Sequence, residues 1–284
     1  MKIQDLNGRK VYILGFGREG KAMFRAIERD ARDAKMTVGD KDENAMKELT
    51  STGKLRVALV FAPSGGAFFV IKDADGKPRG VTADLAAALG QKLNVPVEYV
   101  LFPNSGLATD ATESGAVDVS FMPVDEERKN RIAFGPAYLQ GESTYMVTAA
   151  TGAKTVEDVD KPGMRVIGIA NTTTIRAAGR TLKHTTISPV TSVGDAVAAM
   201  RDGKADAFAL SRDTLPTYVK QVPGSLMVDG AFQKINVSIA VAKGKPAALA
   251  AVTEFLNEAK KSGLVRRVFD THGLPNAQVA PLTE

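Results

Sequence analysis

Cysteine is absent from the 284 residues of this chain. Its absence excludes disulfides, thiolate metal sites and a cysteine nucleophile, but it leaves the cellular compartment open. Only two histidines are present, His184 and His272, and neither lies in a metal-ligand motif. We therefore expect no metal site.

Charge of one sign is never concentrated, although the net charge is +5. Acidic and basic side chains alternate, as in Glu126-Glu127-Arg128-Lys129-Asn130-Arg131, and no run of five like charges occurs. Aromatic residues make up only 6% of the sequence. This pattern is typical of a solvated surface, so no nucleic-acid partner is expected.

Long apolar runs are also missing. No segment reaches the roughly 18 apolar residues of a membrane helix, and no apolar stretch follows Lys2 as a signal peptide requires. Taken as written, the sequence predicts a cytoplasmic chain. Its length and its 44% share of hydrophobic residues predict a globular protein of two domains.

Strand and helix patterns alternate from Lys54 onward. Predicted strands cover residues 55–60, 68–71, 95–100, 117–121, 165–169, 205–210 and 238–241, and predicted helices cover 82–93, 173–182, 193–202, 246–262 and 264–272. This alternation predicts an α/β fold with a largely parallel sheet in two similar units. The extended segments 143–147 and 237–241 predict two crossings between the units, as a hinge needs.

A separate pattern occupies the first fifty residues. Strands over 9–15 and 36–38 flank a predicted helix over 21–32, and a polar helix and linker follow over 41–52. A G-x-G-x-x-G motif and a later acid have the spacing of a nucleotide fingerprint. Its candidate cofactor-binding residues are Gly15, Gly17, Gly20 and Asp40.

Together with the run Val11-Tyr12-Ile13-Leu14, this motif resembles the nucleotide-binding opening of a Mur-type ligase, which implies a UDP-sugar ligand. The likeness covers only residues 1–50, whereas a nucleotide domain needs several more strands. No G-x-x-x-x-G-K-[ST] phosphate loop occurs in the sequence. We therefore expect a Rossmann-like βαβ segment that binds no cofactor, and the alternative is a nucleotide-linked sensor.

Four motifs follow one another downstream. They are Gly53-Lys54-Leu55-Arg56-Val57-Ala58, Gly80-Val81-Thr82-Ala83-Asp84-Leu85, Gly115-Ala116-Val117-Asp118-Val119, and Asp125-Glu126-Glu127-Arg128-Lys129 with Ile132-Ala133-Phe134-Gly135-Pro136-Ala137-Tyr138. In order and spacing they resemble the polar amino-acid family of bacterial periplasmic solute-binding proteins of ABC transporters. The resemblance runs from residue 53 to the end. It implies a two-lobed type II fold with a two-stranded hinge.

The resemblance further implies that residues 51–146 plus 240–284 form the first lobe and 147–239 the second. It implies binding without catalysis, a small carboxylate ligand (an amino acid above all), a membrane ABC permease as partner, a monomer and a periplasmic location. The location conflicts with the missing signal peptide. The alternative on the same scaffold is a dehydratase-like enzyme acting on a cyclic carboxylate, which needs a general acid.

Arg128 is the residue that the resemblance implies as the carboxylate clamp. A planar guanidinium matches a carboxylate with two parallel hydrogen bonds and stays charged at working pH. The alternative is a surface arginine that pairs with Glu126 or Glu127. Opposite Arg128 we expect the turn Asn171-Thr172-Thr173-Thr174, because free N–H groups at a helix start suit an anion. The alternative is simple capping by Asn171 or Thr172.

Other positions depart from the family pattern. Phe61 and Ser64 lie where the family often has an acid for the ligand ammonium, and Phe121 and Pro123 replace a small residue and a threonine. The two phenylalanines either stack on the ligand or belong to the core.

In the second unit, Asp213 is the candidate acid, whereas an inward-pointing Arg212 favours a ligand with a second acidic group. A carboxylate is therefore expected, and the α-amino group is left open.

Overall fold

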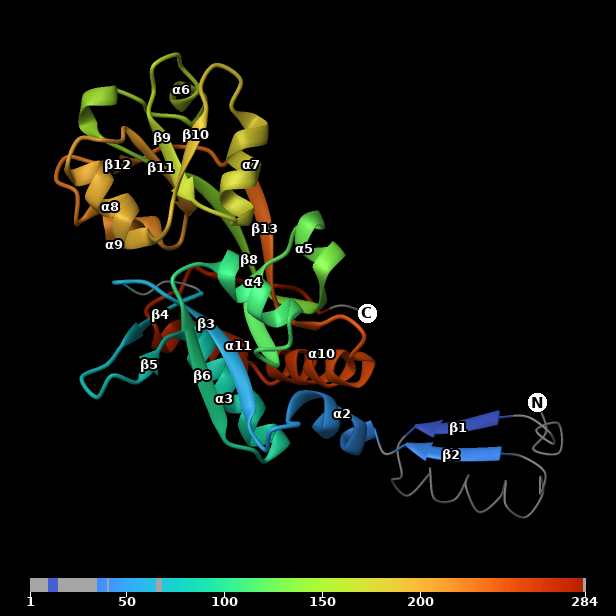
Figure 1. Ribbon diagram of the computed structural model, residues 1–284. Helices are drawn as coiled ribbons and strands as arrows, with labels where there is room; N and C mark the ends of the chain where they lie inside the picture. Colours follow the sequence, from blue (N-terminus) through green and yellow to red (C-terminus); the bar gives the residue numbers. More distant parts are fainter. Residues whose placement is uncertain (1–9, 15–34, 40, 65–67, 283–284) are drawn as a thin grey trace.

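The computed structural model describes residues 10–14, 35–39, 41–64 and 68–282. Two α/β lobes are joined by two long strands, β8 (Ile132–Val147) and β13 (Gln233–Ala242), as Figure 1 shows. These strands pair antiparallel, and the ladder shifts register on both sides of Ser238. The two extended segments predicted to cross between the units, 143–147 and 237–241, therefore belong to these two paired strands.

Lobe 1 surrounds β3, whose apolar residues are buried because β4, β6 and β7 flank it and helices cover it. Its elements are β3 (Leu55–Phe61), β4 (Phe69–Lys72), β5 (Pro78–Arg79), α3 (Val81–Leu93), β6 (Val97–Phe102), α4 (Ser105–Glu113), β7 (Val119–Pro123), α5 (Glu126–Arg131), α10 (Pro246–Lys261), α11 (Leu264–Thr271) and β14 (Gln278–Val279). β3 pairs in parallel with β4, β6 and β7.

Lobe 2 repeats this arrangement around β9, which pairs in parallel with β10 and β11. Its elements are η2 (Ala149–Thr151), α6 (Val156–Val159), β9 (Val166–Ile169), α7 (Thr173–Thr181), β10 (Ile187–Val190), α8 (Val193–Arg201), β11 (Ala207–Ser211), α9 (Leu215–Val219) and β12 (Leu226–Met227). β11 joins β8, so one sheet runs through both lobes in the order β10-β9-β11-β8-β13-β7-β3-β4-β5. The predicted strands and helices of both lobes are confirmed to within a few residues.

Each lobe fixes its first strand with an arginine–aspartate pair. In lobe 1, Arg56 donates from N and Nε to Asp118 Oδ2 at 2.9 and 3.0 Å and from Nη2 to Oδ1 at 2.7 Å. In lobe 2, Arg165 makes the same three bonds to Asp206 at 2.9, 2.9 and 2.6 Å. Both aspartates end a G-x-x-D turn whose glycine has a positive φ, a conformation that other residues rarely adopt.

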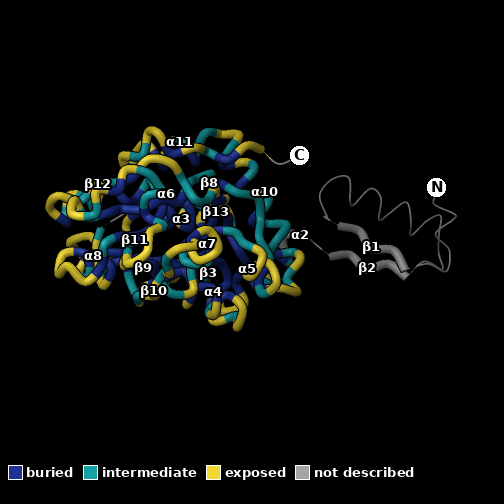
Figure 2. The backbone as a smooth tube through the Cα atoms, turned by 90° about the horizontal axis from the view of Figure 1, so that it is seen from above, coloured by how far each residue is buried: buried dark blue, intermediate teal, exposed yellow. Residues whose placement is uncertain are grey.

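The N-terminal part divides into two. β1 (Lys10–Leu14) and β2 (Lys35–Gly39) pair in parallel, as the predicted strand–helix–strand unit requires, and stand apart from the lobes in Figure 1. In Figure 2, buried backbone lies inside the two lobes and exposed loops lie around their outer edge. The helix predicted between them lies outside the described residues.

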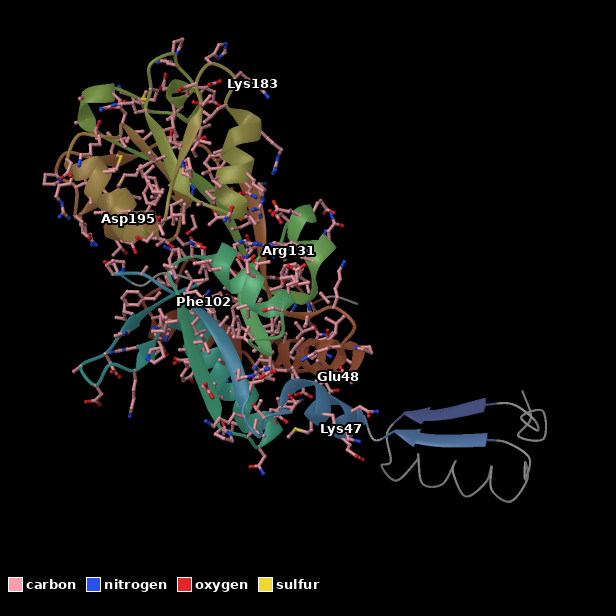
Figure 3. All side chains as sticks on the ribbon, in the orientation of Figure 1. Lys47, Glu48, Phe102, Arg131, Lys183 and Asp195 are labelled. Atoms are coloured by element: carbon pink, nitrogen blue, oxygen red, sulfur yellow. The ribbon has the colours of Figure 1, made fainter. Side chains whose placement is uncertain are left out.

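α2 (Lys41–Leu49) instead packs against α10. Glu48, labelled beside α10 in Figure 3, accepts from Ala248 N at 2.7 Å, while Leu49 is fully buried. The lobe boundaries given above stay a prediction.

Buried apolar side chains connect the lobes. One large cluster runs from lobe 1 into the facing side of lobe 2, where it includes Ile169 and Leu210, and a smaller cluster lies on the other side of β9 and β11. The lobes are thus in contact. Among the described helices, none combines the length and the apolar character that crossing a bilayer requires.

Candidate functional site

Arg128 is buried between the lobes, with 1% of its surface exposed. Its Nη1 donates to Pro123 O at 2.9 Å, and its Nη2 donates to Ser105 Oγ at 2.7 Å and to Asn171 O of lobe 2 at 3.3 Å. Nε has no hydrogen-bond partner among the described residues. The guanidinium therefore contacts three neutral oxygens from both lobes and leaves its Nε–H unused.

The interpretation of Arg128 as a surface residue paired with a neighbouring glutamate is wrong. Glu126 pairs with Lys129 at 2.7 Å, and Glu127 pairs with Arg176 of lobe 2 at 2.9 Å. Helix capping fixes the position of Arg128 on α5. Asp125 caps α5 by accepting from Arg128 N at 2.9 Å, which fixes this residue at the third position of the helix.

The electrostatic surroundings of Arg128 favour an anion. Burial first and the positive charge of Arg176 second lower the pKa of Arg128 to about 10, against the opposing effect of Asp125 and Glu127. The guanidinium is still charged at neutral pH. A buried charge without an opposite charge in contact is costly, so a ligand carboxylate would stabilise it through charge-assisted hydrogen bonds.

The turn before α7 faces Arg128 from lobe 2. Thr172 caps the helix, since its Oγ1 accepts from Ile175 N at 3.3 Å. The capping interpretation is therefore correct for Thr172. Asn171 adopts a left-handed φ of 58°, and its carbonyl contacts Arg128. Thr173 is 1% exposed, and its hydroxyl has no partner among the described residues.

A cavity of about 20 Å³ lies between these elements. Its lining combines apolar side chains with small polar ones: Phe68, Phe69, Asn104, Ser105, Pro123, Ile169, Thr172, Thr173, Thr174, Ala209 and Leu210. Four residues predicted for the site, Pro123 and Thr172 to Thr174, thus line one cavity. Arg128 does not line it but contacts two of its lining residues, Ser105 and Pro123. This volume holds about one water molecule, so a solute can enter only when the lobes separate.

Polar contacts across the cleft hold the lobes together. Arg176 Nε donates to Asp125 Oδ2 at 2.8 Å. On the opposite side, Tyr218 OH donates to Ser64 O and Gln221 Nε2 to Ser64 Oγ, each at 2.6 Å. Ser64 therefore contributes to lobe contact and does not line the cavity. The arrangement is that of a closed clamp.

The two phenylalanines outside the cavity have structural surroundings. Phe121 is 1% exposed and meets Tyr138 edge-on at 5.9 Å between ring centroids. Phe61 is half-buried, with Lys72 Nζ 5.8 Å from its ring centroid. Neither ring lines the cavity. The core interpretation is therefore correct for Phe121, and the structure does not bring either ring into contact with Arg128.

Arg212 and Asp213 lie elsewhere, in a groove of about 680 Å³ that also includes Arg79 and His272. Arg212 does not point toward Arg128, because its Nε donates to Glu142 Oε2 at 3.1 Å. Burial raises the pKa of Asp213, and the charge of Arg212 opposes this rise. The expectation that Arg212 or Asp213 completes the site beside Arg128 is not met.

The nucleotide motif cannot be placed. Gly15, Gly17, Gly20 and Asp40 lie outside the described residues, so both the nucleotide site and the Mur-type resemblance stay predictions. Within the described part of the chain, no three histidine, cysteine or acidic side chains gather as a metal site would require.

Sequence reasoning missed the polar residues Asn104, Ser105 and Arg176, and it missed the apolar lining of Phe68, Phe69, Ile169, Ala209 and Leu210. Asn104 caps α4 by accepting from Leu107 N at 3.0 Å and donates to Thr191 O of lobe 2 at 3.0 Å. An asparagine directly before a helix is a capping signal, and it could have predicted the start of α4. No local signal marks Arg176, whose partners lie in the other lobe.

Comparisons with known proteins agree with this geometry. The model of the bacterial extracellular solute-binding proteins, family 3, matches residues 61–274. A glutamine-binding protein of Geobacillus stearothermophilus is 23% identical over 218 residues, which are 74% of this chain and 80% of that protein. The ABC transporter glutamine-binding protein GlnH of Bacillus subtilis (strain 168) is 20% identical over 254 residues, 87% of this chain and 93% of that protein.

The fold matches solved structures. The ancestral amino acid-binding protein AncCDT-1, a precursor of cyclohexadienyl dehydratase, has a TM-score of 0.70 and 28% identity, covering 80% of this chain and 98% of that one. The predicted two-lobed type II fold is therefore confirmed. The matched family and the two curated relatives are binding proteins rather than enzymes.

Proposed function

The chain belongs to the bacterial extracellular solute-binding proteins, family 3, and from this premise we propose that it binds a small carboxylate, an amino acid or a related acid, between its lobes. Closure would follow from contacts that the ligand makes to both lobes at once. The enzyme alternative has less support, because the lining of the cavity within the described residues contains no acidic side chain that could act as a general acid.

We further propose that the chain delivers this solute to a membrane ABC permease from the periplasm, as a monomer. The family is described as extracellular, and one curated relative is named as an ABC transporter protein. Both support a role outside the cytoplasm.

The single observation that carries the proposal is the buried guanidinium of Arg128. It is held by Pro123, Ser105 and Asn171 from both sides of the cleft, and no carboxylate contacts it within the described residues. A ligand carboxylate would supply the missing negative charge and accept from the unused Nε. The neighbouring Thr173 hydroxyl is a second unused group at the same place.

A thermal-shift screen tests the proposal. Wild type, Arg128→Met and Arg131→Met are compared with a panel of amino acids, 2-oxo acids and other small carboxylates. Arg131, labelled on α5 in Figure 3, is the matched control, because it lies on the same helix but pairs at the surface with Asp110 and Glu113.

At a hundredfold its dissociation constant, a ligand adds roughly 2.7 kcal/mol of stability. We expect a raised midpoint in wild type and Arg131→Met and none in Arg128→Met. An equal shift in Arg128→Met, or no shift with any carboxylate, would contradict the proposal.

A further inference from the structure

The cavity beside Arg128 contains no negative side chain. Its polar members within the described residues are one amide, Asn104, and the hydroxyls of Ser105 and of Thr172 to Thr174. The chain between residues 64 and 68 reads Gly65-Gly66-Ala67 and therefore carries no side-chain charge. The charge next to this cavity is thus the positive one of Arg128, which contacts the lining residues Ser105 and Pro123.

The nearest carboxylates already have partners. Asp125 accepts from Arg128 N at 2.9 Å through Oδ1 and from Arg176 Nε at 2.8 Å through Oδ2. Glu127 pairs with the same Arg176 at 2.9 Å. Asp213 lines the larger groove, with its Oδ2 beside Gly141 of the strand β8, and does not line the cavity. None of the three is placed to receive a cation next to a carboxylate bound by Arg128.

A second arginine, Arg176 of lobe 2, does not change this balance. Its ion pairs with Asp125 and Glu127 compensate its charge, whereas the guanidinium of Arg128 contacts only neutral oxygens. An α-ammonium is separated from its carboxylate by one carbon, so it would have to enter the same cavity. Burying it there without a carboxylate is costly, and the charge of Arg128 would repel it.

The apolar part of the cavity lining suits the uncharged part of a ligand. Phe68, Phe69, Ile169 and Leu210 contribute apolar surface from both lobes. All four are less than 8% exposed, so a ligand between them loses its contact with water. Apolar groups gain free energy from such burial, whereas an unpaired charge loses it.

We propose, as a refinement that rests on the proposed function, that this cleft selects carboxylates that lack an α-ammonium. The substrate class is a 2-oxo, 2-hydroxy or unsubstituted carboxylic acid with a small apolar body. Its carboxylate accepts from Arg128 and from the Thr173 hydroxyl, and its body packs between the phenylalanines of lobe 1 and the aliphatic residues of lobe 2.

Isothermal titration calorimetry with matched acids tests this selection. Each apolar amino acid is compared with the 2-oxo, 2-hydroxy and deaminated acids of the same carbon skeleton, for example leucine with 4-methyl-2-oxopentanoate, 2-hydroxy-4-methylpentanoate and 4-methylpentanoate. Wild type and Arg128→Met are titrated alongside. We expect at least one acid without the amine to bind wild type about 100-fold more tightly than its amino acid, and Arg128→Met to lose this binding.

The outcomes separate the two proposals. If an amino acid binds as tightly as its amine-free counterparts or more tightly, and loses binding in Arg128→Met, the selection is refuted while carboxylate binding between the lobes stands. If no compound of either series binds in a way that depends on Arg128, both proposals are overturned.

Discussion

The two lobes are alike inside and unlike where they face each other. Both fix their first strand with an arginine–aspartate pair after a G-x-x-D turn. Across the cleft, lobe 1 supplies the buried guanidinium of Arg128, whereas lobe 2 supplies the turn at Asn171 and threonine hydroxyls. A repeated scaffold thus provides stability twice, whereas the proposed carboxylate clamp comes from one lobe.

The two arginine–aspartate pairs also differ in burial. The side chain of Asp118 is fully buried and that of Arg56 is 22% exposed, whereas Asp206 and Arg165 are 21% and 54% exposed. Because water screens exposed ion pairs and not buried ones, the same bonding pattern should have unequal value in the two lobes.

The largest effect is expected for Asp118→Ala. It removes the buried carboxylate that accepts from the Arg56 backbone N–H, Nε and Nη2, and the guanidinium keeps only the carbonyl oxygens of Gly115 and Ala116. The free energy of unfolding should therefore fall by about 3–5 kcal/mol. Urea denaturation followed by circular dichroism measures this loss. A loss equal to that of Asp206→Ala would show that burial does not distinguish the lobes.

The next effect concerns closure. Arg176→Gln removes the ion pairs to Asp125 and Glu127 across the cleft, and ligand affinity should fall about tenfold, or ~1.4 kcal/mol. Calorimetric titration checks it. Arg165→Gln is the control, because that arginine lies in the same lobe and pairs with Asp206 of its own lobe. Equal affinity losses in both variants would contradict a role in closure.

A smaller effect is expected for Asp206→Ala. Its pair with Arg165 is partly solvated, so the loss of unfolding free energy should be about 1 kcal/mol, as for exposed pairs. The same urea titration provides the value. A loss several times larger would mean that the Arg165–Asp206 pair stabilises lobe 2 as strongly as the Arg56–Asp118 pair stabilises lobe 1.

The smallest effect is a pH dependence at Asp213. Burial raises its pKa above the ordinary value of 3.8, so the folded state retains the proton longer than the unfolded state. Stability from this group therefore falls as pH rises from 3.8 through the raised pKa. We expect Asp213→Asn to match wild type at low pH and to gain stability over it across this window. Melting midpoints against pH measure this, and a constant difference would refute it.

The sequence could predict the elements but only part of the site. Apolar periodicity correctly placed strands such as β3, and the motif around Arg128 singled out a residue that the structure buries between the lobes. Its adjacent glutamates suggested a surface pair, because sequence proximity does not reveal that α5 directs Arg128 inward. Ser105 and Asn171, which contact it, come from other segments of the chain. Ser105 belongs to the same lobe but to another helix, and Asn171 belongs to lobe 2, so these contacts depend on the tertiary structure and no local pattern could predict them.

A crystal structure of the chain with its tightest-binding carboxylate would test the account most directly. We predict that both carboxylate oxygens lie within hydrogen-bond distance of the Arg128 guanidinium, between Ser105 and the turn at Thr172 to Thr174. A ligand bound instead in the groove of Arg79, Arg212 and His272, with the contacts of Arg128 unchanged, would contradict the account.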